Sequence, residues 1–214
     1  MSSKVNNKEF WDERYLNKTM PWDINQVAPA FVKYFSKFKP NNSKIAVLGS
    51  GLGHDAFFFA NIKEGRSNIY GFDFSSFAVE FCNLIKIKEK LQNISFYKVD
   101  FFELIKDEKW KNYFDYVIEH TSLCAIDPNR RTEYANLIHY LLKPKGKLAG
   151  LFFIRPEKLG GPPFGMTPTS VKELFKEGFK DITELYKEEC LHGALQGEEY
   201  FGVLMNVTIH IQNS

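Results

Sequence analysis

Cysteine is scarce in this chain and long apolar runs are absent, and both facts limit the classes of protein to which it can belong. The three cysteines, Cys82, Cys124 and Cys190, are widely spaced and form no Cys-x-x-Cys pair. Neither a disulfide framework nor a zinc site is therefore indicated. No apolar run approaches the roughly 18 residues that span a bilayer, and residues 1–10 lack the apolar core of a signal peptide. We expect a cytoplasmic protein with no bound metal and no membrane partner.

A surplus of charge is also missing. The formal net charge is +2, and no dense cluster of Lys and Arg occurs. This balance is too weak to predict a nucleic-acid partner. No repeat, low-complexity tract or linker divides the 214 residues, which are enough for one domain with a sizeable core. We predict a single domain over 1–214, with 1–44 as an N-terminal helical cap and 45–214 as the core, in a monomer or weak homodimer.

What the chain does have is a glycine-rich turn after an apolar run. Ile45–Leu48 indicates a buried strand, glycines stand at 49, 51 and 53, and an unbroken apolar segment then indicates a helix. Strand, glycine turn and helix together can cradle a nucleotide. His54 stands where a dinucleotide-binding pattern needs glycine, which disfavours an NAD enzyme. The spacing, followed by the acid Asp55, resembles the loop of S-adenosylmethionine (SAM)-dependent methyltransferases. A glycine turn without a ligand is the alternative.

Strand-like and helical runs alternate along the rest of the chain. The expected strands are Ile45–Leu48, Asn68–Phe72, Ile94–Val99, Phe114–Ile118, Lys147–Ile154, Lys180–Tyr186 and Tyr200–Ile211. The expected helices are Asn6–Leu16, Ala28–Phe38, His54–Ile62, Ser75–Leu91, one that opens at Asp127-Pro128 and one that opens at Thr167-Pro168. The pattern predicts an α/β fold with a seven-stranded, mostly parallel sheet, helices on both faces and an antiparallel C-terminal hairpin, as in the Rossmann-like class I methyltransferases.

Acidic residues end several of the expected strands, where such sheets bind ligands. Asp73 could accept hydrogen bonds from two ribose hydroxyls, or it could cap the helix that follows. Asp100-Phe101-Phe102 could bind the amino group and ring of adenine, or it could be a turn with core phenylalanines. Glu119 and His120 end the fourth strand. His120 could act as a base or polarise a methyl acceptor, although a structural histidine is the commoner case.

Several further segments carry a family resemblance. They are Phe10-Trp11-Asp12-Glu13-Arg14-Tyr15, Met20-Pro21-Trp22-Asp23, Leu123-Cys124-Ala125-Ile126 and Gly160-Gly161-Pro162-Pro163-Phe164. Together with the glycine turn and Asp100-Phe101-Phe102-Glu103, they make residues from about 8 to about 178 resemble the thiopurine S-methyltransferase family, and most of all its halide/thiol methyltransferase branch.

The resemblance implies SAM as the cofactor and methyl transfer to a small soft nucleophile such as a thiol, hydrosulfide, halide or thiocyanate. The implied cofactor-binding residues are Trp11, Trp22, Gly49, Ser50, Gly51, Asp73, Phe74, Asp100, Phe101, Phe102 and Glu119. The catalytic candidates are His120, Tyr15 and Asp23.

Two departures from the family pattern leave the acceptor open. Ile24-Asn25 replaces a usual glycine, and Glu119–Ser122 replaces the Tyr-Thr-Phe of many relatives. A metalloid oxyanion or a heteroaromatic thiol is therefore an alternative acceptor. A SAM-binding protein without catalysis is a further alternative. Residues 187–199 carry no pattern that we can interpret.

Overall fold

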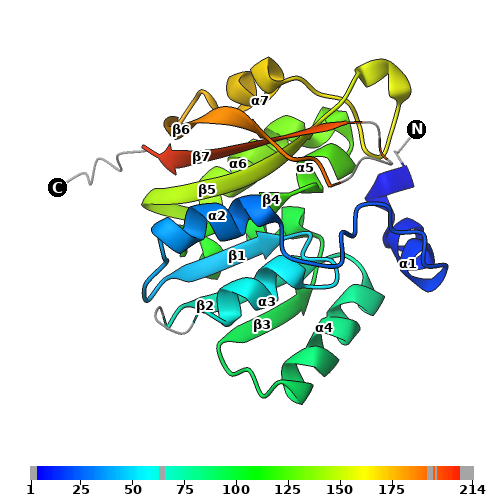
Figure 1. Cartoon of the computed structure of the whole chain (residues 1–214), viewed down its shortest axis with the longest axis vertical. Coiled ribbons are helices and arrows are strands. Elements are labelled where there is room, and N and C mark those ends of the chain that lie inside the picture. The colour runs from blue at the N-terminus through cyan, green and yellow to red at the C-terminus, as the bar shows by residue number, and fades with distance from the viewer. Residues whose placement is uncertain (1–3, 63–65, 192–194, 196, 208–214) are drawn as a thin grey trace.

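The computed structural model describes residues 4–62, 66–191, 195 and 197–207, and within them a single sheet runs through the molecule (Figure 1). Its strands are β1 (Lys44–Leu48), β2 (Asn68–Asp73), β3 (Ile94–Lys98), β4 (Phe114–His120), β5 (Leu142–Ile154), β6 (Phe179–Glu188) and β7 (Glu198–Asn206). The order is β3-β2-β1-β4-β5-β7-β6. The first five strands pair in parallel, and β7 pairs antiparallel with both β5 and β6. The predicted seven-stranded sheet with its antiparallel hairpin is confirmed.

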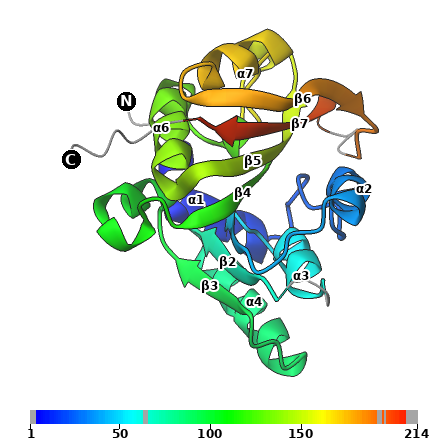
Figure 2. The same ribbon diagram turned by 90° about the vertical axis from the view of Figure 1, so that its left-hand side faces the viewer.

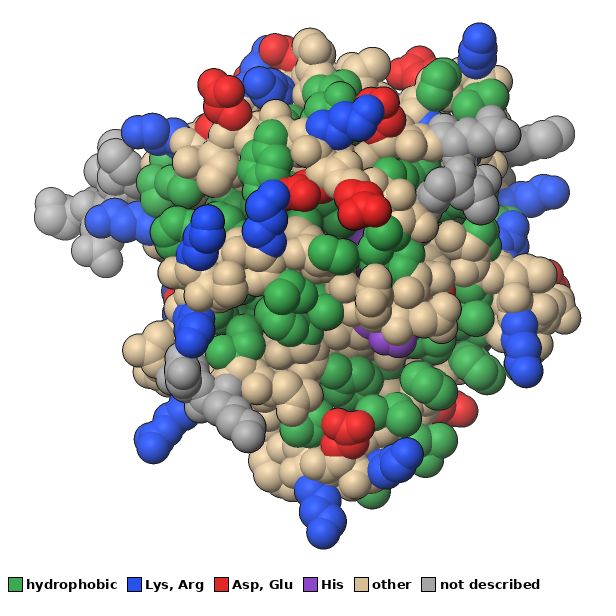
Figure 3. Space-filling model, viewed as in Figure 1, with side chains coloured by type: hydrophobic (Ala, Val, Ile, Leu, Met, Phe, Trp, Pro, Cys, Tyr) green, Lys and Arg blue, Asp and Glu red, His purple; other side chains and the backbone are tan. Residues whose placement is uncertain are grey.

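Helices cover both faces of this sheet, as Figures 1 and 2 show. They are α1 (Lys8–Leu16), α2 (Pro29–Lys37), α3 (His54–Ala60), α4 (Ser76–Lys88), α5 (Ser122–Ala125), α6 (Arg131–Leu141) and α7 (Pro168–Phe175). Short 3₁₀ turns lie at Lys4–Asn6, Phe101–Lys106, Glu108–Trp110, Pro128–Arg130 and Glu157–Leu159. On the face viewed in Figure 3, Lys and Arg side chains stand apart from one another and gather into no basic patch.

Alternation along the strands divides the core between the two faces. Ile45 and Val47 of β1 belong to the cluster that includes Phe31 of α2 and Phe59 of α3, whereas Ala46 and Leu48 belong to the cluster under α6 and α7. Successive side chains of a strand point to opposite faces, so one short apolar run supplies both cores. This explains why β1 has an unbroken apolar sequence.

Capping residues explain where several helices begin. The Ser75 hydroxyl accepts a hydrogen bond from the Ala78 N–H at the start of α4, and Thr167 and Ser170 form a reciprocal capping box at α7. The helix expected at Asp127-Pro128 begins as a 3₁₀ turn, and the α-helix follows at Arg131.

The C-terminal strands differ in length from their predicted bounds. β5 begins at Leu142 rather than Lys147, because Leu142 already pairs with Phe114 before a register shift. β7 runs from Glu198 to Asn206, and the expected strand residues 208–211 lie outside the described residues. No helix among the described residues is long and apolar enough to cross a membrane.

Candidate functional site

A cavity of about 480 Å³ opens beyond the carboxyl ends of the parallel strands. It lies where the strand order reverses between β1 and β4, which is where open α/β sheets bind ligands. Of the residues predicted from the sequence, the cavity is lined by Trp11, Tyr15, Trp22, Gly49, Asp73, Phe74, Asp100, Phe101 and Phe102. The fold thus brings residues from four separate segments of the chain to one cavity.

The glycine turn has a left-handed backbone that residues with side chains rarely adopt. Gly49, Gly51 and Gly53 have φ values of +60°, +54° and +82°. A Cβ at Gly49 would also collide with the Ser122 hydroxyl, which donates a 2.7 Å hydrogen bond to the Leu48 carbonyl. The turn therefore approaches α5 closely because its first residue has no side chain. Gly49 borders the large cavity, whereas Ser50 and Gly51 border a hollow of about 50 Å³ behind the turn.

Asp73 both caps a turn and faces the cavity. Its Oδ2 accepts the Gly51 N–H at 2.7 Å, and its Oδ1 accepts the Ser75 N–H at 2.8 Å. Burial raises the pKa of Asp73 to about 6, although the two backbone N–H groups favour the ionised form. Each carboxylate oxygen keeps a second lone pair. The same side chain can therefore hold the glycine turn and accept hydrogen bonds from ribose hydroxyls.

An acid and two aromatic rings follow β3 at the cavity. Asp100 Oδ1 accepts the Phe102 N–H at 3.0 Å and starts the 3₁₀ turn. The Arg130 guanidinium lies 3.5 Å from the Phe102 ring centroid and 3.8 Å from Asp100 Oδ2. Phe101 and Phe102 offer apolar surface, and Asp100 offers an acceptor, as adenine binding requires. Arg130 also lines the cavity. Apart from its place after β4, nothing in the sequence marked it as a site residue.

The N-terminal aromatic residues form a cluster on α1 and the turn after it. The rings of Trp11 and Trp22 lie 5.5 Å apart, those of Tyr15 and Trp22 lie 5.9 Å apart, and Tyr15 stacks on Phe77 of α4. The Ser75 hydroxyl donates to the Asp12 carboxylate, which attaches α1 to the start of α4. Burial raises the pKa of Tyr15 well above its ordinary value, so its phenol stays protonated at neutral pH.

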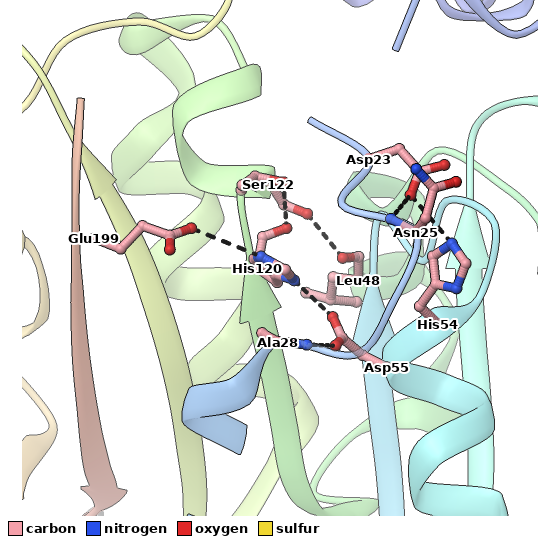
Figure 4. A network of polar contacts seen from close by, with 10 residues as sticks. Asp23, Asn25, Ala28, Leu48, His54, Asp55, His120, Ser122 and Glu199 are labelled. Atoms are coloured by element: carbon pink, nitrogen blue, oxygen red, sulfur yellow. Dashed lines mark hydrogen bonds and ion pairs between the residues drawn. The ribbon is translucent and has the colours of Figure 1, made fainter. Parts of the chain in front are cut away.

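His120 lies behind the glycine turn, within a network of carboxylates (Figure 4). Its Nδ1 is 2.7 Å from Asp55 Oδ2, and its Nε2 is 4.0 Å from Glu199 Oε1. The Ala28 N–H donates to the other Asp55 oxygen at 3.0 Å. Burial alone would lower the pKa of His120, but Asp55 and Glu199 raise it above its ordinary value. His120 borders the small hollow and does not line the large cavity.

Glu119 and Asp23 also lie outside the cavity lining. Glu119 is buried beneath the cavity, where one oxygen accepts the Leu123 N–H at 2.8 Å and the other accepts the Tyr134 hydroxyl. Burial raises the pKa of Glu119. Asp23 accepts the Asn25 N–H at 2.8 Å and lies 3.1 Å from His54 Nε2 beside the small hollow (Figure 4). The roles expected of these two acids stay predictions.

The remaining wall of the cavity comes from segments whose individual residues were not named as site residues from the sequence, although the sequence placed Gly160–Phe164 in a candidate lid and Glu119–Ser122 near the acceptor. It is formed by residues such as Thr121, Cys124, Ile126, Pro162, Pro163 and Leu195. Two family motifs, Leu123–Ile126 and Gly160–Phe164, contribute to it, and Leu195 comes from the uninterpreted 187–199 segment. Burial raises the pKa of the Cys124 thiol, which donates to the Thr121 carbonyl, so this thiol is not a ready nucleophile.

A Rossmann-like sheet with a C-terminal hairpin, a glycine turn with left-handed backbone and acids at the ends of β2 and β3 together form the site expected of a SAM-dependent methyltransferase. A solved structure of this architecture is the 1,6-didemethyltoxoflavin-N1-methyltransferase of Burkholderia thailandensis with bound S-adenosylhomocysteine. It matches with a TM-score of 0.72 and 16% identity over 95% of this chain and 88% of that chain.

The chain belongs to the thiopurine S-methyltransferase family, whose model matches residues 6–206. It is 30% identical over 196 residues to probable thiol methyltransferase 2 of Arabidopsis thaliana, which covers 90% of this chain and 82% of that protein. It is 29% identical over 175 residues to thiocyanate methyltransferase 1 of Brassica oleracea, covering 81% of this chain and 74% of that protein. The predicted family and the predicted cofactor, SAM, are thereby confirmed.

Proposed function

We propose that this methyltransferase acts on a small soft nucleophile: a thiol, hydrosulfide, thiocyanate or halide. The carrying observation is the chemistry of the wall formed by Cys124, Ile126, Pro162, Pro163 and Leu195. Among these described residues only Cys124 can ionise, and burial raises its pKa. Glu13, Asp73 and Asp100 line other parts of the same cavity, but this wall itself provides no base, which suits an acceptor that needs none. The names of two relatives, a thiol and a thiocyanate methyltransferase, support the same acceptor class.

The chemistry asks for alignment more than for proton transfer. SAM, when bound, supplies an activated methyl group on a sulfonium and leaves as a thioether. A thiol is a few per cent thiolate at pH 7, and a halide or thiocyanate has no proton to lose. The protein must then place the nucleophile in line with the methyl group and exclude water. The apolar wall residues suit both tasks.

In this proposal the cofactor-binding residues have distinct roles. Asp73 accepts the ribose hydroxyls, and Asp100 with Phe101 and Phe102 holds adenine. Trp11 and Trp22, within the cap of residues 1–44, cover the cofactor. Ser50, Gly51 and Phe74 shape the turn around it, and Glu119 supports the floor from below. Tyr15, Asp23 and His120 remain catalytic candidates. Burial raises the pKa of Tyr15, and His120 is held by Asp55 away from the large cavity, so both favour positioning over proton abstraction.

The cysteines and the surface charges bear on the cellular location and on the kind of partner. No disulfide joins Cys82, Cys124 and Cys190 within the described residues, which suits the reducing cytoplasm. The face in Figure 3 carries no basic patch, which favours a small-molecule acceptor over nucleic acid. The cytoplasmic location and the monomeric or weakly dimeric state stay predictions.

The test is release of S-adenosylhomocysteine from SAM with hydrosulfide, thiocyanate, iodide, an aromatic thiol and arsenite in parallel, alongside calorimetric binding of S-adenosylhomocysteine. We expect turnover with at least one of the first three. Turnover only with the aromatic thiol or arsenite would move the acceptor to the bulkier or metalloid class. Tight cofactor binding with no turnover on any acceptor would favour a SAM-binding protein without catalysis.

A further inference from the structure

We infer that Arg131 holds the diproline turn, residues 160–165, as a fixed wall of the acceptor side, and that this wall limits the size of the acceptor. The inference rests on the proposed function for the identity of the acceptor. The position of the wall itself rests only on contacts between residues of this chain.

Arg131 is the first residue of α6, and its guanidinium reaches the end of the diproline turn. Its Nη2 donates to the carbonyl of Gly165 at 2.9 Å and to that of Phe164 at 3.3 Å. Two successive carbonyls are therefore oriented by one planar group on a helix. Arginine suits this task because its planar guanidinium presents donors in a fixed geometry.

Three further contacts hold the same turn. The Phe164 N–H donates to the Cys124 carbonyl at 2.6 Å, and Arg155 and Met166 form an antiparallel bridge that closes the base of the loop. Gly165 packs so closely on the backbone of Glu157 that any side chain would collide with it. The turn is thus attached at several points to α5, to α6 and to the segment that follows β5.

The held turn presents prolines to the cavity. Pro162 and Pro163 line it together with Cys124, Ala125 and Ile126. Because Phe164 is bonded to Cys124, the diproline face and the α5 face cannot separate without breaking that hydrogen bond. A wall that cannot retreat admits a small acceptor and excludes a bulky one. Size selection here follows from the rigidity of the wall rather than from a polar contact with the acceptor.

A second arginine allows the charge of Arg131 to be separated from its hydrogen bonds. Arg155 also lies close enough to Cys124 to act on the thiol electrostatically, as Arg131 does. The Nε of Arg155 is buried and has no hydrogen-bond partner in the described structure. Arg155→Met therefore removes one positive charge near the same wall and leaves both carbonyl contacts of Arg131 in place.

The experiment compares wild type, Arg131→Met, Arg131→Lys and Arg155→Met with hydrosulfide and an aromatic thiol. We expect Arg131→Met to lower the preference for hydrosulfide, as the ratio of kcat/KM values, by about ten-fold, mainly through the two KM values. Arg131→Lys should recover part of the preference. Arg155→Met should leave it within about two-fold of wild type, and all four proteins should bind S-adenosylhomocysteine equally within about two-fold.

A readout without turnover keeps the two proposals separable. Hydrogen exchange of a peptide spanning 155–166, with S-adenosylhomocysteine bound, should be roughly five-fold faster in Arg131→Met than in wild type. If exchange is faster in Arg131→Met but the wild type methylates none of the acceptors, the fixed wall is supported and the proposed function is contradicted. A wild type that turns over, with preference and exchange unchanged in Arg131→Met, would overturn the inference. An Arg155→Met variant with the same changes in preference and exchange as Arg131→Met would also overturn the inference. If Arg131→Met does not fold, exchange and preference in Arg131→Lys decide in the same way.

Discussion

The Asp73 carboxylate accepts the Gly51 N–H at 2.7 Å and so joins the end of β2 to the glycine turn after β1. The pair connects two segments on neighbouring parallel strands at the edge where the cavity opens. One group thereby maintains the shape of the turn and supplies acceptors to the cofactor. Any change at Asp73 is therefore expected to affect both the turn and the cofactor.

Replacing Asp73 by alanine should weaken cofactor binding. A hydrogen bond to a charged group is worth roughly 1.5–3 kcal/mol, so the dissociation constant of S-adenosylhomocysteine should rise about ten-fold or more. Isothermal titration calorimetry measures this directly. Asp181→Ala, on the exposed side of β6, is the matched control and should bind as wild type does. An Asp73→Ala protein with unchanged affinity would remove Asp73 from the ribose site.

Cofactor binding should also depend on pH through Asp73, whose pKa burial raises to about 6. The ionised carboxylate is the better acceptor for ribose hydroxyls, so affinity should be constant above about pH 7 and fall below pH 6. At pH 5 only about a tenth of a group with pKa 6 is ionised, which predicts a loss of up to about ten-fold. An Asp73→Asn protein cannot titrate at this position, and a persisting pH dependence in it would assign the effect to another group.

The same pKa shift has the opposite effect on the stability of the ligand-free protein. Because the folded-state pKa of Asp73 lies above its ordinary value, the folded state binds this proton more tightly. Its contribution to the free energy of unfolding therefore decreases as pH rises from about 4 to about 6, by up to about 3 kcal/mol. Thermal denaturation with and without S-adenosylhomocysteine should show ligand stabilisation that grows over this range.

Local patterns made much of this architecture predictable. The apolar run of β1, the glycines at 49 to 53 and the acid at the end of β2 are signals within a few residues, and each lies where it was expected. Their physical causes act over the same short range: pleat alternation, backbone conformation and strand termination. This is why the fold and the cofactor side of the cavity could be predicted from the chain alone.

The partners of side chains from distant segments could not be predicted in this way. His120 meets Asp55 and Glu199, and Arg131 reaches Phe164, only after separate elements have packed. Thr121 is a different case. It has a φ of +64° at the start of α5, a conformation that glycine or asparagine would have signalled, but a β-branched residue stands there. The sequence marked the Glu119–Ser122 segment as unusual, but the left-handed turn at Thr121 could not be predicted from it.

Replacing His120 by glutamine should destabilise the protein in a pH-dependent way. Asp55 and Glu199 raise the pKa of His120 despite its burial, so the imidazolium contributes stability below the ordinary histidine pKa of about 6.5, and this is lost as pH rises through the higher folded-state value. The difference in melting temperature between wild type and His120→Gln should therefore be large near pH 6 and shrink toward pH 9.

Kinetics of the same variant test whether His120 is a base. If His120 has a positioning role, kcat of His120→Gln should change while its pH profile keeps the wild-type shape. The profile is measured with thiocyanate, an acceptor that has no proton. A His120→Gln profile that loses one ionisation seen with hydrosulfide, but keeps the thiocyanate rate, would instead identify His120 as the base.

Replacing Gly49 by alanine should disturb the cavity in two ways, through backbone strain and through a steric collision. Gly49 has a φ of +60°, and its new Cβ would also meet the Ser122 hydroxyl. Gly178, in the turn between α7 and β6, provides the control outside the cavity lining, because its φ is +80°. Both alanine variants should lose roughly 1–3 kcal/mol of stability to backbone strain, and only Gly49→Ala should also lose affinity for S-adenosylhomocysteine.

A second substitution tests the collision itself. Ser122→Gly removes the hydroxyl that the Gly49→Ala methyl would strike, so the double variant should bind S-adenosylhomocysteine more tightly than Gly49→Ala does. Calorimetry on the four combinations of the two positions gives the coupling energy between them. If the two substitutions prove additive, the loss in Gly49→Ala comes from backbone strain alone, and the close approach of the glycine turn to α5 is not what shapes the cofactor side of the cavity.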